Sequence, residues 1–152
     1  MEKYGYSNVF RVTDYIHPFD TYEGQDVILF DEFMSDNMSV TDMNNIMDGY
    51  PLKLPARYSD KTALFTKVFI ISNLELEKQY SKVQDEHPKV WEAFLRRIQT
   101  VITYRGMNQY TTQSREEYMK TVYSFKSLPP ENVTPFSPGQ KKTYRQTSLK
   151  LK

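Results

Sequence analysis

Two short apolar runs, each closed by polar residues, constrain this chain most. Val27-Ile28-Leu29-Phe30 runs into Asp31-Glu32, and Val68-Phe69-Ile70-Ile71 runs into Ser72-Asn73. Neither run alternates with polar residues, so each is expected to be buried on both faces, as strands of a parallel sheet are. Ligands of open α/β sheets bind at the carboxyl ends of such strands. The sequence therefore predicts a polar, ligand-facing edge where these two strands end.

The rest of the chain predicts an alternation of strands and helices. Expected strands lie at 8–12, 26–32, 67–73 and 101–104, with an irregular hairpin over 50–67. Expected helices lie at 39–48 with Ser39 as N-cap, at 88–99 with Pro88 in its first turn, and at 114–125 opened by a Ser114/Glu117 capping box. This alternation predicts an α/β layered domain.

Composition bounds the class of protein. The 152 residues, with a formal net charge of +1 and no Cys, suit one domain without disulfides or thiolate metal sites. No apolar run approaches the roughly 20 residues of a membrane span, and no signal peptide is evident. We therefore expect a soluble, intracellular domain over residues 1–127. Residues 128–152 hold four prolines and five basic residues, so they are predicted to form a disordered basic tail.

The polar ends of the two apolar strands could carry chemistry. In nucleotide hydrolases a buried strand ending in two acids presents one carboxylate to Mg²⁺ and a second to the attacking water, roles open to Asp31 and Glu32. An amide at the neighbouring strand end, Asn73, could hydrogen-bond a γ-phosphate. The alternatives are a solvated strand end and an ordinary Ser-Asn turn.

Basic residues recur along the predicted hairpin, with Tyr58 and Phe65 between them. Cations that follow phosphates and rings that stack on bases suit a single strand of nucleic acid. A solvated loop with scattered basic residues is the alternative. The candidates are Lys53, Arg57, Lys61 and Lys67.

Arg96 and Arg97 lie off the apolar stripe of the 88–99 helix, so at least one faces outward. An exposed arginine on a rigid helix can reach the γ-phosphate held by a neighbouring subunit, as an arginine finger does. Surface arginines on an amphipathic helix are the alternative.

The order of these motifs carries a resemblance. Asp31-Glu32, then residues 48–53 (Asp-Gly-Tyr-Pro-Leu-Lys), then 65–73 (Phe-Thr-Lys-Val-Phe-Ile-Ile-Ser-Asn), then 94–98 (Phe-Leu-Arg-Arg-Ile) follow in one direction. This series resembles the superfamily-three helicase domain of circovirus-like and plasmid rolling-circle replication initiators. The resemblance covers about Tyr6 to Tyr104.

The resemblance implies a partial P-loop ATPase of the AAA+-like, three-layer kind with a mostly parallel sheet. It implies ATP with Mg²⁺ as cofactors, Asp31 as the residue that holds the metal through the nucleotide, Glu32 as the water-polarising carboxylate and Asn73 as a polar sensor. It implies single-stranded DNA or RNA on the hairpin, at Lys53, Arg57, Lys61 or Lys67, and a finger from Arg96 or Arg97 in a homo-oligomeric ring or in a ring with full-length initiator subunits. No membrane is implied; the compartment would be a bacterial cytoplasm for a plasmid or the host nucleus for a virus.

One departure from the family pattern is large. No G-x-x-x-x-G-K-[ST] occurs, and the five glycines stand singly. The family has this phosphate loop before the segment that corresponds to Met1–Tyr6, so the chain is expected to start in the helix that follows the loop. The strand that precedes the loop, beside residues 68–71, would also be missing. We therefore expect a poorly stable chain, a sheet that closes around the gap, or a strand supplied by another chain.

Three functions fit these observations. The first is the helicase and ATPase portion of a replication initiator, which unwinds nucleic acid in DNA replication and is inactive alone without its phosphate loop. The second is a non-enzymatic, truncated subunit that regulates a full-length ring. The third is a module that binds single-stranded nucleic acid.

Overall fold

The computed structural model describes residues 3–126 and 146–151. The strands are β1 (Val9–Val12), β2 (Val27–Phe30), β3 (Lys53–Leu54), β4 (Lys61–Thr62), β5 (Lys67–Ser72), β6 (Ile98–Gly106), β7 (Gln109–Ser114) and β8 (Gln146–Leu151). The helices are α1 (Val40–Ile46), α2 (Ser81–Glu86), α3 (Pro88–Arg97) and α4 (Arg115–Lys126), with short 3-10 turns η1 (Tyr6–Asn8) and η2 (Leu76–Lys78).

The strands form a main sheet with the order β1-β2-β5-β8-β6-β7 and a small β3–β4 hairpin. Strands β1, β2 and β5 are parallel, and the residues of β2 pair with β5 from Val27 opposite Lys67 to Phe30 opposite Ile70. All four residues of β2 are buried, as expected for a strand inside a parallel sheet. The predicted α/β class is confirmed.

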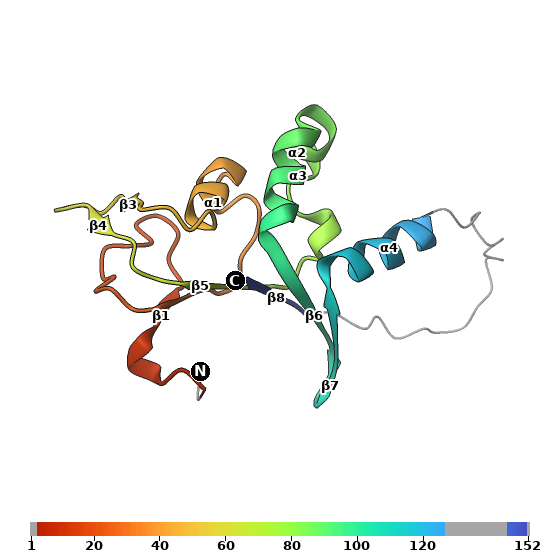
Figure 1. Cartoon of the computed structure of the whole chain (residues 1–152), viewed down its shortest axis with the longest axis horizontal. Helices are drawn as coiled ribbons and strands as arrows, with labels where there is room; N and C mark the ends of the chain where they lie inside the picture. Colours follow the sequence, from red (N-terminus) through yellow and green to blue (C-terminus); the bar gives the residue numbers. More distant parts are fainter. Residues whose placement is uncertain (1–2, 127–145, 152) are drawn as a thin grey trace.

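The core lies on one face of this sheet. Figure 1 shows α1, α2 and α3 on that side and the N-terminal segment on the other. Phe30 and Ile70 from the sheet, Met43 from α1 and Phe94 from α3 are fully buried in one cluster, which Tyr118 of α4 also joins. Burial of this apolar surface is the main stabilising contribution to the fold. No helix in the described part of the chain is long and apolar enough to cross a membrane.

The two predicted helix caps are present. The Ser39 hydroxyl accepts from the backbone N–H of Asp42 (3.1 Å). At α4, the Ser114 hydroxyl accepts from the backbone N–H of Glu117 (3.3 Å), and the Glu117 carboxylate accepts from the N–H of Ser114 (3.0 Å). These bonds satisfy donors that a helix N-terminus otherwise leaves unpaired. The backbone N–H and then the hydroxyl of Ser114, which both donate to the Glu117 carboxylate, hold its pKa below its usual range.

Strand β8 corrects part of the tail prediction. Residues 146–151 form a strand that is antiparallel to both β5 and β6, whereas 127–145 and 152 lie outside the described residues. β8 therefore occupies the position beside β5 where the family resemblance left a gap. The sequence analysis did not anticipate that the chain itself would supply this strand. Pairing on both sides satisfies backbone N–H and C=O groups of β5 and β6 that would otherwise lack partners. The polar sequence of β8 gives no sign of this pairing.

Three further elements differ from the predictions. β6 extends over nine residues, and its partner β7 was not predicted because its sequence, QYTTQS, is polar and every residue of it is at least partly exposed. Helix α2 was also missed, since it is short and has no buried residue. The two missed elements depend on contacts with their neighbours more than on an apolar pattern of their own: β7 pairs with β6, and α2 packs against α3.

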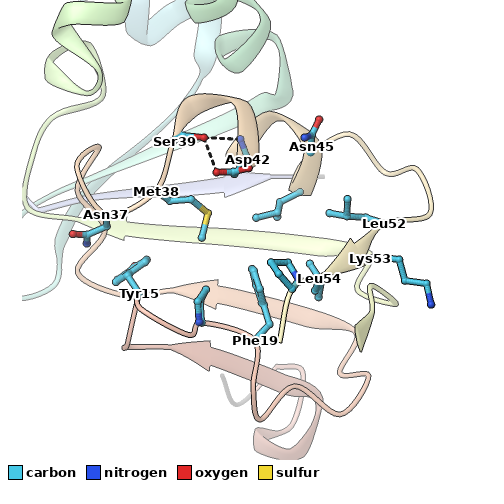
Figure 2. A pocket seen from close by; sticks show the side chains of 13 residues that line it. Tyr15, Phe19, Asn37, Met38, Ser39, Asp42, Asn45, Leu52, Lys53 and Leu54 are labelled. Atoms are coloured by element: carbon cyan, nitrogen blue, oxygen red, sulfur yellow. Dashed lines mark hydrogen bonds between the residues drawn. The ribbon is translucent and has the colours of Figure 1, made fainter. Parts of the chain in front are cut away.

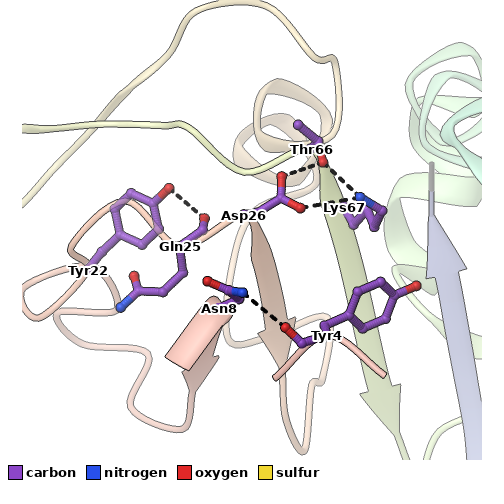
Figure 3. A network of polar contacts seen from close by, with 7 residues as sticks. All are labelled: Tyr4, Asn8, Tyr22, Gln25, Asp26, Thr66 and Lys67. Carbon is purple, nitrogen blue, oxygen red and sulfur yellow. Dashed lines mark hydrogen bonds and ion pairs between the residues drawn. The ribbon is translucent and has the colours of Figure 1, made fainter. Parts of the chain in front are cut away.

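A polar network joins the starts of β2 and β5 (Figure 3). The carboxylate of Asp26 accepts from the Thr66 hydroxyl at 2.6 Å and from the Lys67 ammonium at 3.3 Å. The Thr66 hydrogen bond, and then the nearby Lys67 charge, hold the pKa of the Asp26 carboxyl below its usual range. Lys67 also lies 5.8 Å from the centre of the Tyr4 ring. This network therefore fixes the N-terminal segment against the sheet.

Asp26→Asn is expected to lower the thermal midpoint of unfolding at neutral pH. The depressed pKa in the folded chain means that the ionised carboxylate stabilises the fold above its unfolded pKa, which is about 4. That contribution is lost as the pH falls through the lower folded pKa, so the two proteins should converge in acid. The effect is expected to be small because the pair is exposed to solvent. Thermal unfolding followed by circular dichroism at a series of pH values measures it.

The control for this experiment is Asp85→Asn, which removes an exposed carboxylate from α2. Its midpoint should follow that of the unchanged chain at every pH. A difference between Asp26→Asn and the unchanged chain that stays constant from neutral to acidic pH would contradict the assigned role of the charge.

Candidate functional site

The polar ends of β2 and β5 lie side by side. We call Asp31, Glu32, Ser72 and Asn73 the polar edge. The backbone N–H of Phe33 donates to the carbonyl of Ile71 (2.8 Å), and the buried Ser72 hydroxyl donates to the carbonyl of Phe33 (2.6 Å). These bonds continue the contact between β2 and β5 beyond the ends of the strands. The turn formed by Asp31 and Glu32, which we call the acidic turn, is therefore fixed against the end of β5.

Ser72 is the centre of a buried polar cluster. Its hydroxyl oxygen also accepts from the backbone N–H of Leu74 (3.0 Å) and from the side-chain amide of Gln79 (2.8 Å). Ser72 and Gln79 are each 1% exposed, so polar atoms that lost these hydrogen bonds could not form replacement bonds to water. The hydrogen bond from the Leu74 N–H to Ser72 is the kind expected if Ser72-Asn73 simply begins a turn, which was the alternative to a sensor role. The hydrogen bond from Ser72 to the carbonyl of Phe33 adds a contact to the residue after the acidic turn.

The acidic turn itself has an unusual backbone. Glu32 has φ of 50°, in the left-handed region that costs a residue with a side chain about 1 kcal/mol or more. The turn is fixed on the β1 side as well, because the Asp31 N–H donates to the carbonyl of Val12 (3.0 Å) and the Tyr15 hydroxyl donates to the carbonyl of Asp31 (2.7 Å). Strained residues of this kind often occur at functional sites.

Arg11 pairs with the carboxylate of Asp31, a contact that sequence reasoning missed. The guanidinium donates from Nε at 2.7 Å and also from Nη2 to the same oxygen, Oδ2. The Asp31 side chain is 15% exposed and that of Arg11 is 56% exposed. The only sequence signal was the position of an arginine in β1 on the face away from the core.

The arrangement does not fit a Mg²⁺–nucleotide site in this chain. Oδ2 of Asp31 is held by Arg11, and Oδ1 accepts from the backbone N–H of Glu32 at 3.2 Å. Among residues 3–126 and 146–151, no three His, Cys, Asp or Glu side chains cluster as potential metal ligands, so Mg²⁺ here would depend on a nucleotide for most of its ligands. The sequence also lacks the loop that would hold the phosphates. We therefore assign no hydrolytic step to the polar edge.

Two tyrosines near the polar edge, the partly buried Tyr15 and the buried Tyr80, are neutral phenols. Burial raises the pKa of Tyr15 far above its usual value, and the negative charges of Asp31 and Glu32 raise it further. Burial likewise raises the pKa of Tyr80, whose hydroxyl donates to the carbonyl of Met38 (2.8 Å). Both hydroxyls therefore act as hydrogen-bond donors that fix the connection between β2 and α1.

The predicted hairpin is confirmed as β3 and β4, which pair antiparallel with Lys53 opposite Thr62 and Leu54 opposite Lys61. We call residues 53–62 the basic hairpin. Figure 1 shows it projecting from the body of the domain, and Leu54, fully buried, anchors its base in the core.

The four candidate cations of this region have different surroundings. Arg57 pairs with Asp20, which accepts from both its backbone N–H (3.0 Å) and its guanidinium, and these hydrogen bonds hold the pKa of Asp20 below its usual range. Lys67 belongs to the Asp26 network. The side chains of Lys53 and Lys61 have no hydrogen-bond or ion-pair partner in the described part of the chain.

The structure also separates the two arginines of α3. Arg97 donates to Asp48 (2.7 Å) and to the carbonyl of Ala93 (2.6 Å), so it joins α3 to the segment after α1. Arg96 is exposed and forms no such bond within the described residues. The finger role of either residue stays a prediction.

No curated protein matches the chain. One family model matches, from η1 through the end of β5, and the matched segment includes Asp31, Glu32, Asn73 and the basic hairpin but not Arg96 or Arg97. The narrower resemblance to replication initiators has no counterpart in this match. Residues 6–74 of the chain match the family model of the RNA helicases.

Proposed function

We propose that this chain is the helicase-type domain of a replication initiator and that it binds single-stranded nucleic acid through the basic hairpin. The family match over residues 6–74 supports a relation to helicases and ATPases. The role in replication rests on the ordered motif set of the sequence. Strand separation driven by ATP hydrolysis would require a phosphate loop that the 152 residues do not contain.

The observation that carries the proposal is the state of the hairpin cations. Lys53 lies opposite Thr62 and Lys61 lies opposite Leu54 on a projecting hairpin, and neither lysine is neutralised by a described carboxylate. A phosphate backbone binds such cations by displacing counterions. Arg57 and Lys67 already hold Asp20 and Asp26, so nucleic acid would compete with those pairs. We therefore assign the phosphate contacts first to Lys53 and Lys61.

Exposed rings beside these cations support the same assignment. Tyr50 is 76% exposed and Tyr58 is 93% exposed, on either side of the hairpin's first strand. The Arg57 guanidinium lies 6.0 Å from the centre of the Tyr58 ring, which keeps an aromatic surface beside a cation. Bases of a single strand stack on such rings with little dependence on sequence.

The double variant Lys53→Gln/Lys61→Gln is expected to bind single-stranded RNA more weakly than the unchanged chain and with a weaker salt dependence. If each lysine contacts one phosphate, the slope of log affinity against log salt should fall in magnitude by about 1.4. Fluorescence anisotropy of a labelled oligoribonucleotide, measured at several salt concentrations, gives both quantities. The same titration with single-stranded DNA shows which nucleic acid is preferred.

The charge-matched control is Lys89→Gln/Lys82→Gln, which removes two exposed lysines from α3 and α2. These helices lie apart from the basic hairpin, so the affinity and the slope should stay close to those of the unchanged chain. Equal losses in the two double variants would mean that net charge, and not the hairpin, binds the nucleic acid. Absence of binding at low salt would reject the proposed function.

The polar edge and Arg96 enter the proposal with a narrower role. We propose that Asp31, Glu32 and Asn73 face a nucleotide only in an assembly that contains a phosphate loop, and that Arg96, rather than Arg97, faces a neighbouring subunit there. The support is positional: the polar edge lies at the carboxyl end of parallel strands, and Arg96 is the exposed member of the pair. A ring that includes full-length initiator subunits is the assembly that would supply the loop.

A further inference from the structure

A cavity of about 460 Å³ lies between the β1–β2 connection, the start of α1 and the first strand of the basic hairpin. Its volume is within the range of small-molecule sites. Figure 2 shows side chains from these three segments around it. The residues of the polar edge are not among those that line it, so it is a separate site.

The walls of the cavity have the chemistry of a base-binding site. Phe19 and Leu54, both buried, form an apolar floor, and the partly buried Tyr15 and Leu52 extend it toward the surface. Aromatic and aliphatic walls of this kind accept the flat face of a nucleobase. A phosphate alone would gain nothing from such a floor, because burying a charge against apolar groups is unfavourable.

Two amides are available to recognise the edge of a base. The side chains of Asn37 and Asn45 both line the cavity, and neither forms a hydrogen bond to another residue of the described chain. Each amide offers two donors and an acceptor. Unstacked bases are read by such groups on their Watson–Crick and Hoogsteen edges.

The charges at the two ends of the cavity orient a nucleotide. The Asp42 carboxylate, which accepts from the Ser39 hydroxyl at 2.6 Å, lies at the helix end, and Lys53 lies at the hairpin end. Figure 2 shows the Lys53 side chain pointing outward at the rim. A phosphate is repelled by Asp42 and attracted by Lys53. A nucleotide therefore fits with its base inside the cavity and its phosphate on the hairpin.

We propose that this cavity binds one unpaired nucleobase of the single strand whose phosphates lie on the basic hairpin. The proposal rests on the proposed function, since Lys53 serves both. The cavity would add a contact to a base, and none of the residues of the polar edge takes part in it. Tyr15, which lines the cavity, donates its hydroxyl to the carbonyl of Asp31, so the base would lie one side chain from the acidic turn.

The test compares two oligoribonucleotides of equal length, about 12 nucleotides, one with bases and one in which every base is replaced by hydrogen. The unchanged chain is expected to bind the abasic strand more than about tenfold more weakly, because that strand loses the base in the cavity and also any stacking on Tyr50 and Tyr58. Asn45→Phe places a ring in the cavity from an exposed position of α1. It should weaken binding of the normal strand by about tenfold, the loss typical of one stacked base, and leave binding of the abasic strand unchanged.

The matched control is Thr41→Phe, which adds the same ring at an exposed position of α1 that does not line the cavity. It should bind both strands as the unchanged chain does. Equal affinity of the unchanged chain for the two strands, with binding that still depends on Lys53 and Lys61, would overturn the base site and leave the proposed function in place. If neither strand binds, both proposals fall. The comparison of the two strands on the unchanged chain needs no variant, so it can overturn the base site even if Asn45→Phe fails to fold.

Discussion

A chain that ends at residue 145 is expected to be largely unfolded at room temperature, and its urea titration should show no cooperative unfolding transition. β8 lies inside the sheet and pairs with Phe69–Ser72 on one side and with residues of Ile98–Tyr104 on the other. Removing it leaves the backbone N–H and C=O groups of both neighbours unpaired and separates β5 from β6. The cost is expected to exceed the 5–15 kcal/mol or so by which a domain of this size is stable. Urea unfolding followed by circular dichroism measures it.

Addition of a synthetic peptide of residues 146–152 should restore part of the transition, because the peptide can pair in the open position between β5 and β6. A peptide of the same composition in scrambled order is the control and should restore less. If the shortened chain unfolds at the same urea concentration and with the same steepness as the whole chain, β8 does not complete the sheet. A rescue that is equal for both peptides would point to non-specific binding.

Ser72→Ala is expected to lower the free energy of unfolding by about 2 kcal/mol. The substitution removes one buried hydroxyl, so the carbonyl of Phe33 and the N–H of Leu74 lose this partner and the amide of Gln79 keeps its 3.3 Å hydrogen bond to the carbonyl of Leu74. The methyl group itself costs little. Urea unfolding of the purified variant measures the change, with Ser59→Ala, an exposed serine on the basic hairpin, as the control.

A double-mutant cycle shows whether the cost comes from unpaired partners. Gln79→Leu removes the amide that donates to Ser72, so the double variant Ser72→Ala/Gln79→Leu should be less destabilised than the sum of the two single changes. Additive effects would mean that the hydroxyl and the amide stabilise the fold independently. An effect of Ser72→Ala no larger than that of Ser59→Ala would contradict the role assigned to the buried cluster.

Local patterns were enough to predict the elements that position the polar edge. The buried run Val27–Phe30 and the strand Lys67–Ser72 follow from apolar sequences too uniform for an exposed strand. The caps at Ser39 and Ser114 follow from side chains that can bond within three residues. These strands and caps depend on residues that are close together in the sequence, so a single sequence is enough to predict them.

Contacts between distant residues could not be predicted in the same way. Arg11 and Asp31 are separated by 20 positions, and only the register of β1 against β2 brings them together. The same holds for β8, whose polar sequence forms a strand because two other strands offer it unpaired backbone groups. The functional roles of Asp31, Glu32 and Asn73 also stay predictions, since the position of a side chain does not establish its chemistry.

The place of β8 in the sheet has a consequence for how the chain folds during synthesis. β1, β2 and β5 leave the ribosome first and β6 and β7 next, but the strand that joins these two groups is made some 40 residues after β6 ends. Until then, two partial sheets with open edges must coexist, and long-range pairing of this kind forms slowly. The nascent chain would therefore be most prone to aggregation, or most dependent on a chaperone, during the interval between the synthesis of β7 and that of β8.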